Sequence, residues 1–104
     1  MSTFEIVDAE PLHAKELVDA GWFVLDVRTD AEWARGHIPG STHMALAEVV
    51  AGVGSRVVEP VLLVTSDDGK GWRVAQYLKQ EGIETGNLVG GLFAWEVAGL
   101  PVER

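Results

Sequence analysis

The stretch VLLVTSDDGKGWRVAQYL, residues 61–78, decides the fold of this 104-residue chain. Its first five residues, VLLVT, form an apolar run that ends in Thr65, which is typical of a strand covered on both faces of a parallel sheet. A glycine-containing loop, SDDGKG, is expected at residues 66–71. Apolar residues then recur at helical spacing, which predicts a helix over residues 72–81. A buried strand, a short loop and a helix together form the repeating unit of an α/β domain.

The same alternation continues on both sides of this stretch. Further helices are expected at residues 10–20, 30–35, 45–51 and 92–98, and further strands at residues 22–27, 42–44 and 84–88. Glycines follow several of these helical segments, and we expect Gly52 and Gly54 to end the helix at residues 45–51. The segment HIPG, residues 37–40, is expected to form a turn. We therefore predict one α/β domain over residues 1–104, with a mainly parallel sheet.

The composition is that of a globular protein with an acidic surface. Hydrophobic residues make up 47% of the chain, and 16 Asp and Glu against 8 Lys and Arg give a formal net charge of −8. Such a surface repels nucleic-acid phosphates and anionic lipids, so no nucleic-acid or membrane partner is expected. No apolar run approaches the roughly 20 residues of a membrane span. The first residues lack the features of a signal peptide, and a cytoplasmic location is expected.

The chain contains no cysteine. This excludes disulfides, thiolate metal sites and a cysteine nucleophile within the chain. The three histidines, His13, His37 and His43, lack the close spacing of a zinc site. The acidic residues of the loop at 66–71 lack the alternating spacing of a calcium loop. We therefore predict neither a metal site nor another cofactor.

Three motifs, taken together and in this order, resemble the rhodanese (thiosulfate sulfurtransferase) domain family. They are LDVR (25–28) with AEW (31–33) and GHIPGS (36–41), then residues 61–78, then LVGGLFAW (88–95) with AGLPV (98–102). The resemblance implies a small doubly wound domain with a central, mainly parallel, five-stranded sheet and helices on both faces. It also implies structural roles for the motif residues Asp26, Arg28, Glu32, His37, Gly90 and Gly91. Asp26 and Arg28 are expected to fix loops by ion pairing. The His37 ring is expected to bond to the backbone, with a ligand or acid–base role as the alternative.

The chemistry that this resemblance implies uses a cysteine at the head of the strand–loop–helix, which carries sulfur as a persulfide. Ser66 takes that position when the motif is aligned from the strand, and Asp68 takes it when the motif is aligned back from Arg73. A serine hydroxyl is a poor nucleophile without an adjacent base, and oxygen cannot store a labile sulfur atom. Asp67 and Asp68 would also repel thiosulfate. We therefore predict no catalytic residue and a vestigial active-site loop that consists of Ser66, Asp67, Asp68, Gly69, Lys70, Gly71, Trp72 and Arg73.

The leading interpretation is a rhodanese-like domain without sulfurtransferase activity. It would be a regulatory or interaction module with an unknown protein partner, or one domain of a larger tandem sulfurtransferase. Two alternatives stay open: an active thiosulfate sulfurtransferase and a small-anion-binding protein. Because ligands of such sheets bind beyond the carboxyl ends of the strands, residues 66–71 are expected to border a shallow pocket there. The core is expected to depend on Leu25, Leu62, Leu63, Val64 and Leu78.

Overall fold

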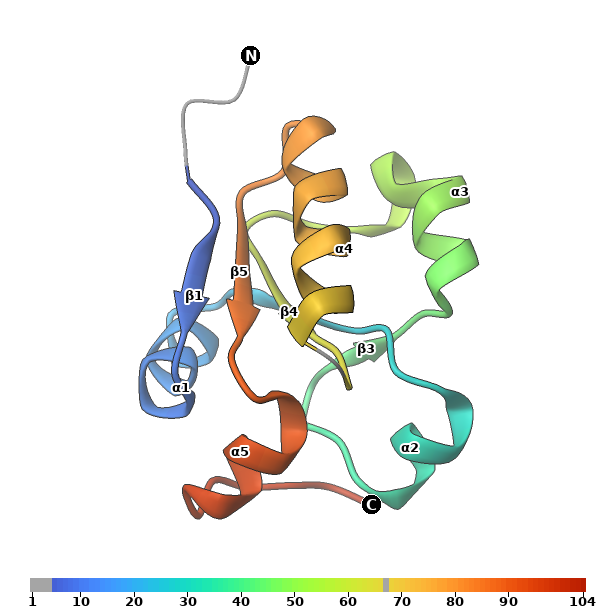
Figure 1. Ribbon diagram of the computed structural model, residues 1–104. Helices are drawn as coiled ribbons and strands as arrows, with labels where there is room; N and C mark the ends of the chain where they lie inside the picture. The colour runs from blue at the N-terminus through green and yellow to red at the C-terminus, as the bar shows by residue number, and fades with distance from the viewer. Residues whose placement is uncertain (1–4, 67) are drawn as a thin grey trace.

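The computed structural model describes residues 5–66 and 68–104, and the side chains of residues 52–56 and 68 lie outside this description. Strands and helices alternate along the chain (Figure 1). In order, the elements are β1 (Val7–Ala9), α1 (Pro11–Asp19), β2 (Phe23–Asp26), α2 (Asp30–Arg35), β3 (Thr42–His43), α3 (Leu46–Arg56), β4 (Val61–Val64), α4 (Asp68–Gln80), β5 (Thr85–Leu88) and α5 (Gly91–Val97). No helix in the described part of the chain is long and apolar enough to cross a membrane.

The strands form a five-stranded sheet in the order β1-β5-β4-β2-β3, and all of its strand pairs are parallel. In the centre of the sheet, Leu25 of β2 is in register with Leu63 of β4. An isolated antiparallel bridge joins His37 to Glu103, and it places the C-terminus beside α2 (Figure 1). The predicted α/β class and five-stranded parallel sheet are confirmed.

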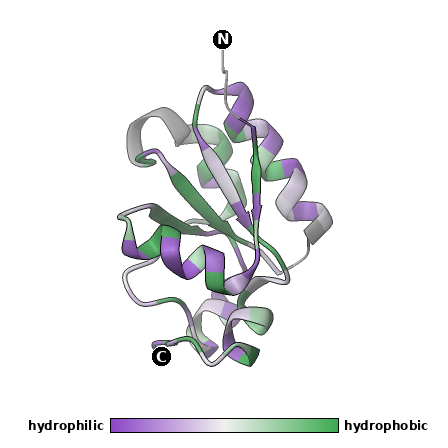
Figure 2. Ribbon diagram, turned by 90° about the vertical axis from the view of Figure 1, so that its left-hand side faces the viewer, coloured by the Kyte–Doolittle hydropathy of each residue, from purple (hydrophilic) through white to green (hydrophobic). Residues whose placement is uncertain are grey.

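Helices cover both faces of the sheet. β4 is buried along its whole length, and its side chains alternate between two hydrophobic clusters, as the pleat of a strand requires. Leu63 packs with residues of α3 and α4 on one face, whereas Leu62 and Val64 pack with residues of α1 and α5 on the other. Hydrophilic and hydrophobic residues alternate along the helices (Figure 2). The five predicted core residues are all fully buried.

Three elements differ from the prediction. The short edge strand β1 was not predicted from the pattern, because three residues carry too little periodicity. α3 does not end at Gly52 but continues through Gly54 to Arg56, since a glycine inside a helix costs only about 1 kcal/mol. α4 begins at Asp68, so most of the loop that was expected at residues 66–71 is helical.

Close packing explains why Gly71, which was expected in this loop, lies in a helix. A Cβ atom at Gly71 would lie 2.7 Å from Asn87 Oδ1 and 2.8 Å from Thr65 Oγ1. The missing side chain therefore lets the first turns of α4 approach the ends of β4 and β5 closely. In sequence, this use of glycine cannot be distinguished from the use of glycine in a loop.

Candidate functional site

A pocket of about 270 Å³ lies beyond the carboxyl ends of β2, β4 and β5. Because these three strands are parallel neighbours, the segments that follow them meet at one edge of the sheet, where α2 and α5 also lie (Figure 1). The pocket is lined by residues of α2 and its flanking segments, of the end of β4, and of α5 and the residue before it. These residues are Arg28, Glu32, Arg35, Gly36, Thr65, Ser66, Gly90, Leu92, Phe93 and Glu96.

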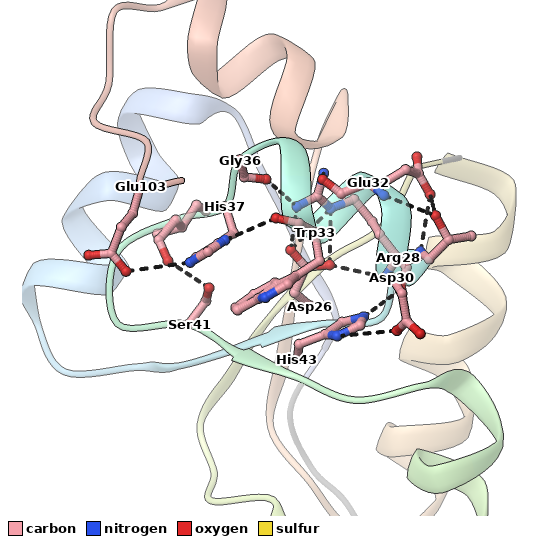
Figure 3. Close-up of polar contacts among 12 residues, drawn as sticks. Asp26, Arg28, Asp30, Glu32, Trp33, Gly36, His37, Ser41, His43 and Glu103 are labelled. Carbon is pink, nitrogen blue, oxygen red and sulfur yellow. Dashed lines mark hydrogen bonds and ion pairs between the residues drawn. The ribbon is translucent and has the colours of Figure 1, made fainter.

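A buried ion pair supports the α2 side of the pocket. Asp26 is fully buried and Arg28 is 7% exposed. Arg28 donates from Nε to both carboxylate oxygens of Asp26 at 3.0 Å, and from Nη2 to Oδ2 at 2.8 Å. The backbone N–H of Arg28 donates to the same carboxylate at 3.0 Å, and Nη2 also donates to the carbonyl of Gly36 at 2.8 Å (Figure 3). The pair therefore ties the end of β2 to the loop that follows α2.

Glu32 fixes the start of α2. The hydroxyl of Thr29 accepts from the backbone N–H of Glu32, and the Glu32 carboxylate accepts from the backbone N–H of Thr29 at 3.1 Å. This is a capping box, which satisfies two N–H groups that the helix leaves without partners. The hydrogen bond from the backbone of Thr29 is the main reason why the pKa of Glu32 is lowered from its ordinary value.

The two histidines near α2 bond to the backbone (Figure 3). His37 Nδ1 lies 3.1 Å from the carbonyl oxygen of Trp33, and His43 Nε2 lies 2.7 Å from that of Arg28. Both rings stack on the indole of Trp33, with ring centroids 3.6 Å and 4.9 Å apart. His37 also exchanges two backbone hydrogen bonds of 2.8 Å with Glu103. In residues 5–66 and 68–104, no group of three His, Asp or Glu side chains could hold a metal ion.

Two consecutive glycines allow α5 to form the opposite wall of the pocket. Gly90 and Gly91 have positive φ angles of 78° and 61°, which residues with a side chain rarely adopt. A Cβ atom at Gly91 would lie 2.4 Å from the carbonyl oxygen of Thr65. The chain therefore turns sharply after β5 and packs against the end of β4, which brings Phe93 and Glu96 to the pocket.

The predicted vestigial loop does not lie at one site. Ser66 lines the pocket, whereas Asp67 and the side chain of Asp68 lie outside the described residues. Gly69 to Arg73 belong to α4. Lys70 and Arg73 line a separate groove between α3 and α4, and Trp72 lines a third cavity with Asp8, Asn87 and Val89.

Arg35, Phe93 and Glu96 line the pocket but were not predicted as site residues. Their signal was the order of the elements, because the segments that follow neighbouring parallel strands meet at the carboxyl edge of the sheet. The described lining contains no imidazole, and its ionisable groups are two arginines and two glutamates. Two hydroxyl side chains, Thr65 and Ser66, lie in this lining, and no histidine accompanies them among the described lining residues.

The chain is similar in sequence to known proteins. The family model of the rhodanese-like domain matches residues 10–98. The chain is 28% identical over 95 residues to the protein named "Putative sulfurtransferase YtwF" of Bacillus subtilis (strain 168), a match that covers 88% of this chain and 92% of that protein.

Solved structures show the same likeness. The Alr3790 protein from Anabaena sp. superposes with a TM-score of 0.81 at 26% identity, over 91% of this chain and 81% of that chain. A rhodanese-related protein from Thermoplasma volcanium superposes with a TM-score of 0.84 at 21% identity, over 93% of this chain and 97% of that chain, which shows likeness of fold.

Proposed function

Since the chain belongs to the rhodanese-like domain family but contains no cysteine, we propose that residues 1–104 form a single sulfurtransferase-related domain that transfers no sulfur. In this proposal the domain acts as an interaction or regulatory module, alone or beside a catalytic domain. The observations that carry it are the absence of cysteine from the chain and the position of Ser66, one of the two residues that align with the family's cysteine, in the lining of the pocket beyond β4. A hydroxyl without a neighbouring base is a poor nucleophile, and oxygen cannot carry a sulfur atom that is later released to an acceptor.

The charges around the pocket support binding without sulfur chemistry. Arg28 is neutralised by the buried carboxylate of Asp26, which leaves Arg35 facing Glu32 and Glu96 among the described lining residues. A dianion such as thiosulfate would therefore meet more negative than positive charge. This disfavours both a sulfurtransferase and a protein that binds small anions in this pocket.

The folded framework supports a binding role. The buried ion pair, the capping box of α2 and the two glycines at the start of α5 hold the segments at this edge in place. A rigid scaffold of this kind can present surfaces to another protein. The name of the Bacillus subtilis relative supports the relationship to sulfurtransferases.

Sulfur transfer from thiosulfate to cyanide tests this proposal in the wild-type chain and four variants. The wild-type chain is expected to form no thiocyanate above a protein-free control. Ser66→Cys is expected to add little, because Asp67 and Asp68 place negative charge beside the new thiolate, which raises its pKa and repels thiosulfate. Replacing the acidic stretch with a neutral or basic cysteine-containing loop is expected to do better. Leu12→Cys, at a side chain that is 68% exposed on α1, reports the background of a thiol outside the pocket.

Two results would overturn the proposal. Wild-type turnover that survives repurification and disappears in Ser66→Ala would show that the chain has oxygen-based chemistry. Robust activity of Ser66→Cys alone, well above that of Leu12→Cys, would show that the pocket still accepts thiosulfate and lacks only its nucleophile.

A further inference from the structure

α3 and α4 enclose an apolar groove of about 290 Å³ that shares no lining residue with the pocket beyond the sheet. Val49 is fully buried and Val74 is 6% exposed, whereas Val50 is 55% exposed and Leu46 is 37% exposed. The groove thus has a buried apolar floor and apolar walls that face solvent. Apolar surface that is arranged in this way on a folded domain marks a site of interaction.

Arg73 places a positive charge at this groove. Its side chain is exposed, and it forms no ion pair with any residue in the described part of the chain. Lys70, one helical turn earlier on α4, also lines the groove. In a chain with twice as many acidic as basic residues, the positive charge of Arg73 beside an apolar groove favours a ligand that carries a carboxylate.

Tyr77 holds the two walls of the groove together. Its hydroxyl donates a hydrogen bond of 3.0 Å to the carbonyl oxygen of Val50, which joins α4 to α3. The hydroxyl therefore already has a partner, and the ring of Tyr77 presents apolar surface to the groove.

We propose that this groove binds an amphipathic segment of a partner protein, which inserts an apolar side chain between α3 and α4 and places a carboxylate beside Arg73. The inference rests on the proposed role of the domain as an interaction module and names the surface and partner chemistry for it. Two neighbouring helices with an apolar groove between them suit the helix-in-groove mode of recognition. A small molecule would remain largely in water between such exposed walls. A second copy of the chain is disfavoured because both copies carry a net charge of −8.

Two blocked helical peptides provide the test. Both carry two leucines one helical turn apart, and they differ only in a residue beside these leucines, which is Glu in one peptide and Lys in the other. Titration into the isotope-labelled protein is followed by the backbone amide signals. The Glu peptide is expected to shift the signals of Val50, Val74 and Tyr77, and the Lys peptide is expected to bind more weakly.

Matched variants separate the groove from the rest of the surface. Arg73→Gln is expected to weaken binding of the Glu peptide about two- to fivefold, as befits an ion pair that stays partly in water. Val50→Glu, which puts a carboxylate on the apolar wall, is expected to weaken it at least about tenfold. Arg35→Gln and Val58→Glu remove a charge and an exposed valine outside the groove, and both are expected to bind like the wild-type chain.

The proposal is overturned if neither peptide shifts these signals at millimolar concentration, if the Lys peptide binds as well as the Glu peptide, or if Arg73→Gln binds like the wild-type chain. Sulfur transfer is measured separately. A protein that transfers no sulfur and binds neither peptide would reject the groove alone, whereas sulfur transfer would reject the proposed function.

Discussion

Replacing Asp26 by alanine is expected to destabilise the domain by about 3–5 kcal/mol, because it leaves the buried guanidinium of Arg28 without a counter-charge. The variant loses three side-chain hydrogen-bond contacts and one backbone contact to the carboxylate. Among the described residues, the Arg28 side chain keeps its bonds to the carbonyl oxygens of Gly36 and Glu32. For a domain of this size, such a loss lowers the melting temperature by roughly 12–40 °C.

Urea denaturation and thermal melting, both followed by circular dichroism, measure this loss. Asp19→Ala is the matched control, because the ion pair of Asp19 with Lys15 lies at the surface, and its removal is expected to cost no more than about 0.5 kcal/mol. The double variant Asp26→Leu/Arg28→Met removes both buried charges and is expected to be more stable than Asp26→Ala.

The reasoning is refuted if Asp26→Ala loses less than about 1 kcal/mol and so resembles Asp19→Ala. It is refuted equally if the double variant is no more stable than the single one, because the unpaired guanidinium would then not be the cause of the loss.

Three further stability predictions follow from the same structure. Leu63→Ala is expected to lower the free energy of unfolding in urea by about 2–5 kcal/mol. Leu12→Ala at the surface is expected to change it by less than about 0.5 kcal/mol. Equal losses in the two variants would contradict the central place of β4. Gly91→Ala is expected to lower the melting temperature more than Gly82→Ala. Both glycines have positive φ, but of the two only Gly91 would bring an added Cβ atom against a carbonyl oxygen. Equal effects of the two substitutions would argue against the close approach of α5 to the end of β4. Glu32→Ala is expected to cost about 0.5–1 kcal/mol at neutral pH. Because folding lowers the pKa of Glu32, its carboxylate stabilises the fold at pH values above the ordinary pKa of 4.5. This stabilisation is lost as the pH falls through the lowered pKa of the folded state. If Glu32→Ala cost the same free energy of unfolding at neutral and at low pH, this role of Glu32 would be contradicted.

Sequence reasoning predicted β4 and α2 well because local signals decide them. The run VLLVT is typical of a strand that is covered on both faces, and β4 is completely buried. The segment DAEWAR was predicted as a helix over residues 30–35, and α2 spans Asp30–Arg35 because a capping box begins it and Gly36 follows it. In contrast, β1 has three residues, and its place beside β5 depends on distant pairing.

The candidate site was harder to predict because several glycines serve packing and not flexibility. Gly71 was interpreted as part of a loop, but it lies in α4, where the missing side chain makes room for Thr65 and Asn87. The start of α4 therefore could not be located from local sequence. For the same reason, sequence alone did not show that Arg73 lies at a groove with α3 while Ser66 lies at the pocket.

Intact-mass spectrometry after incubation with excess thiosulfate shows directly whether the chain takes up sulfur, because it detects a bound sulfur atom without requiring turnover or an acceptor. The absence of any thiol predicts that the mass of the wild-type chain stays unchanged. A covalent adduct of one sulfur atom that cyanide removes, and that Ser66→Ala fails to form, would contradict the account.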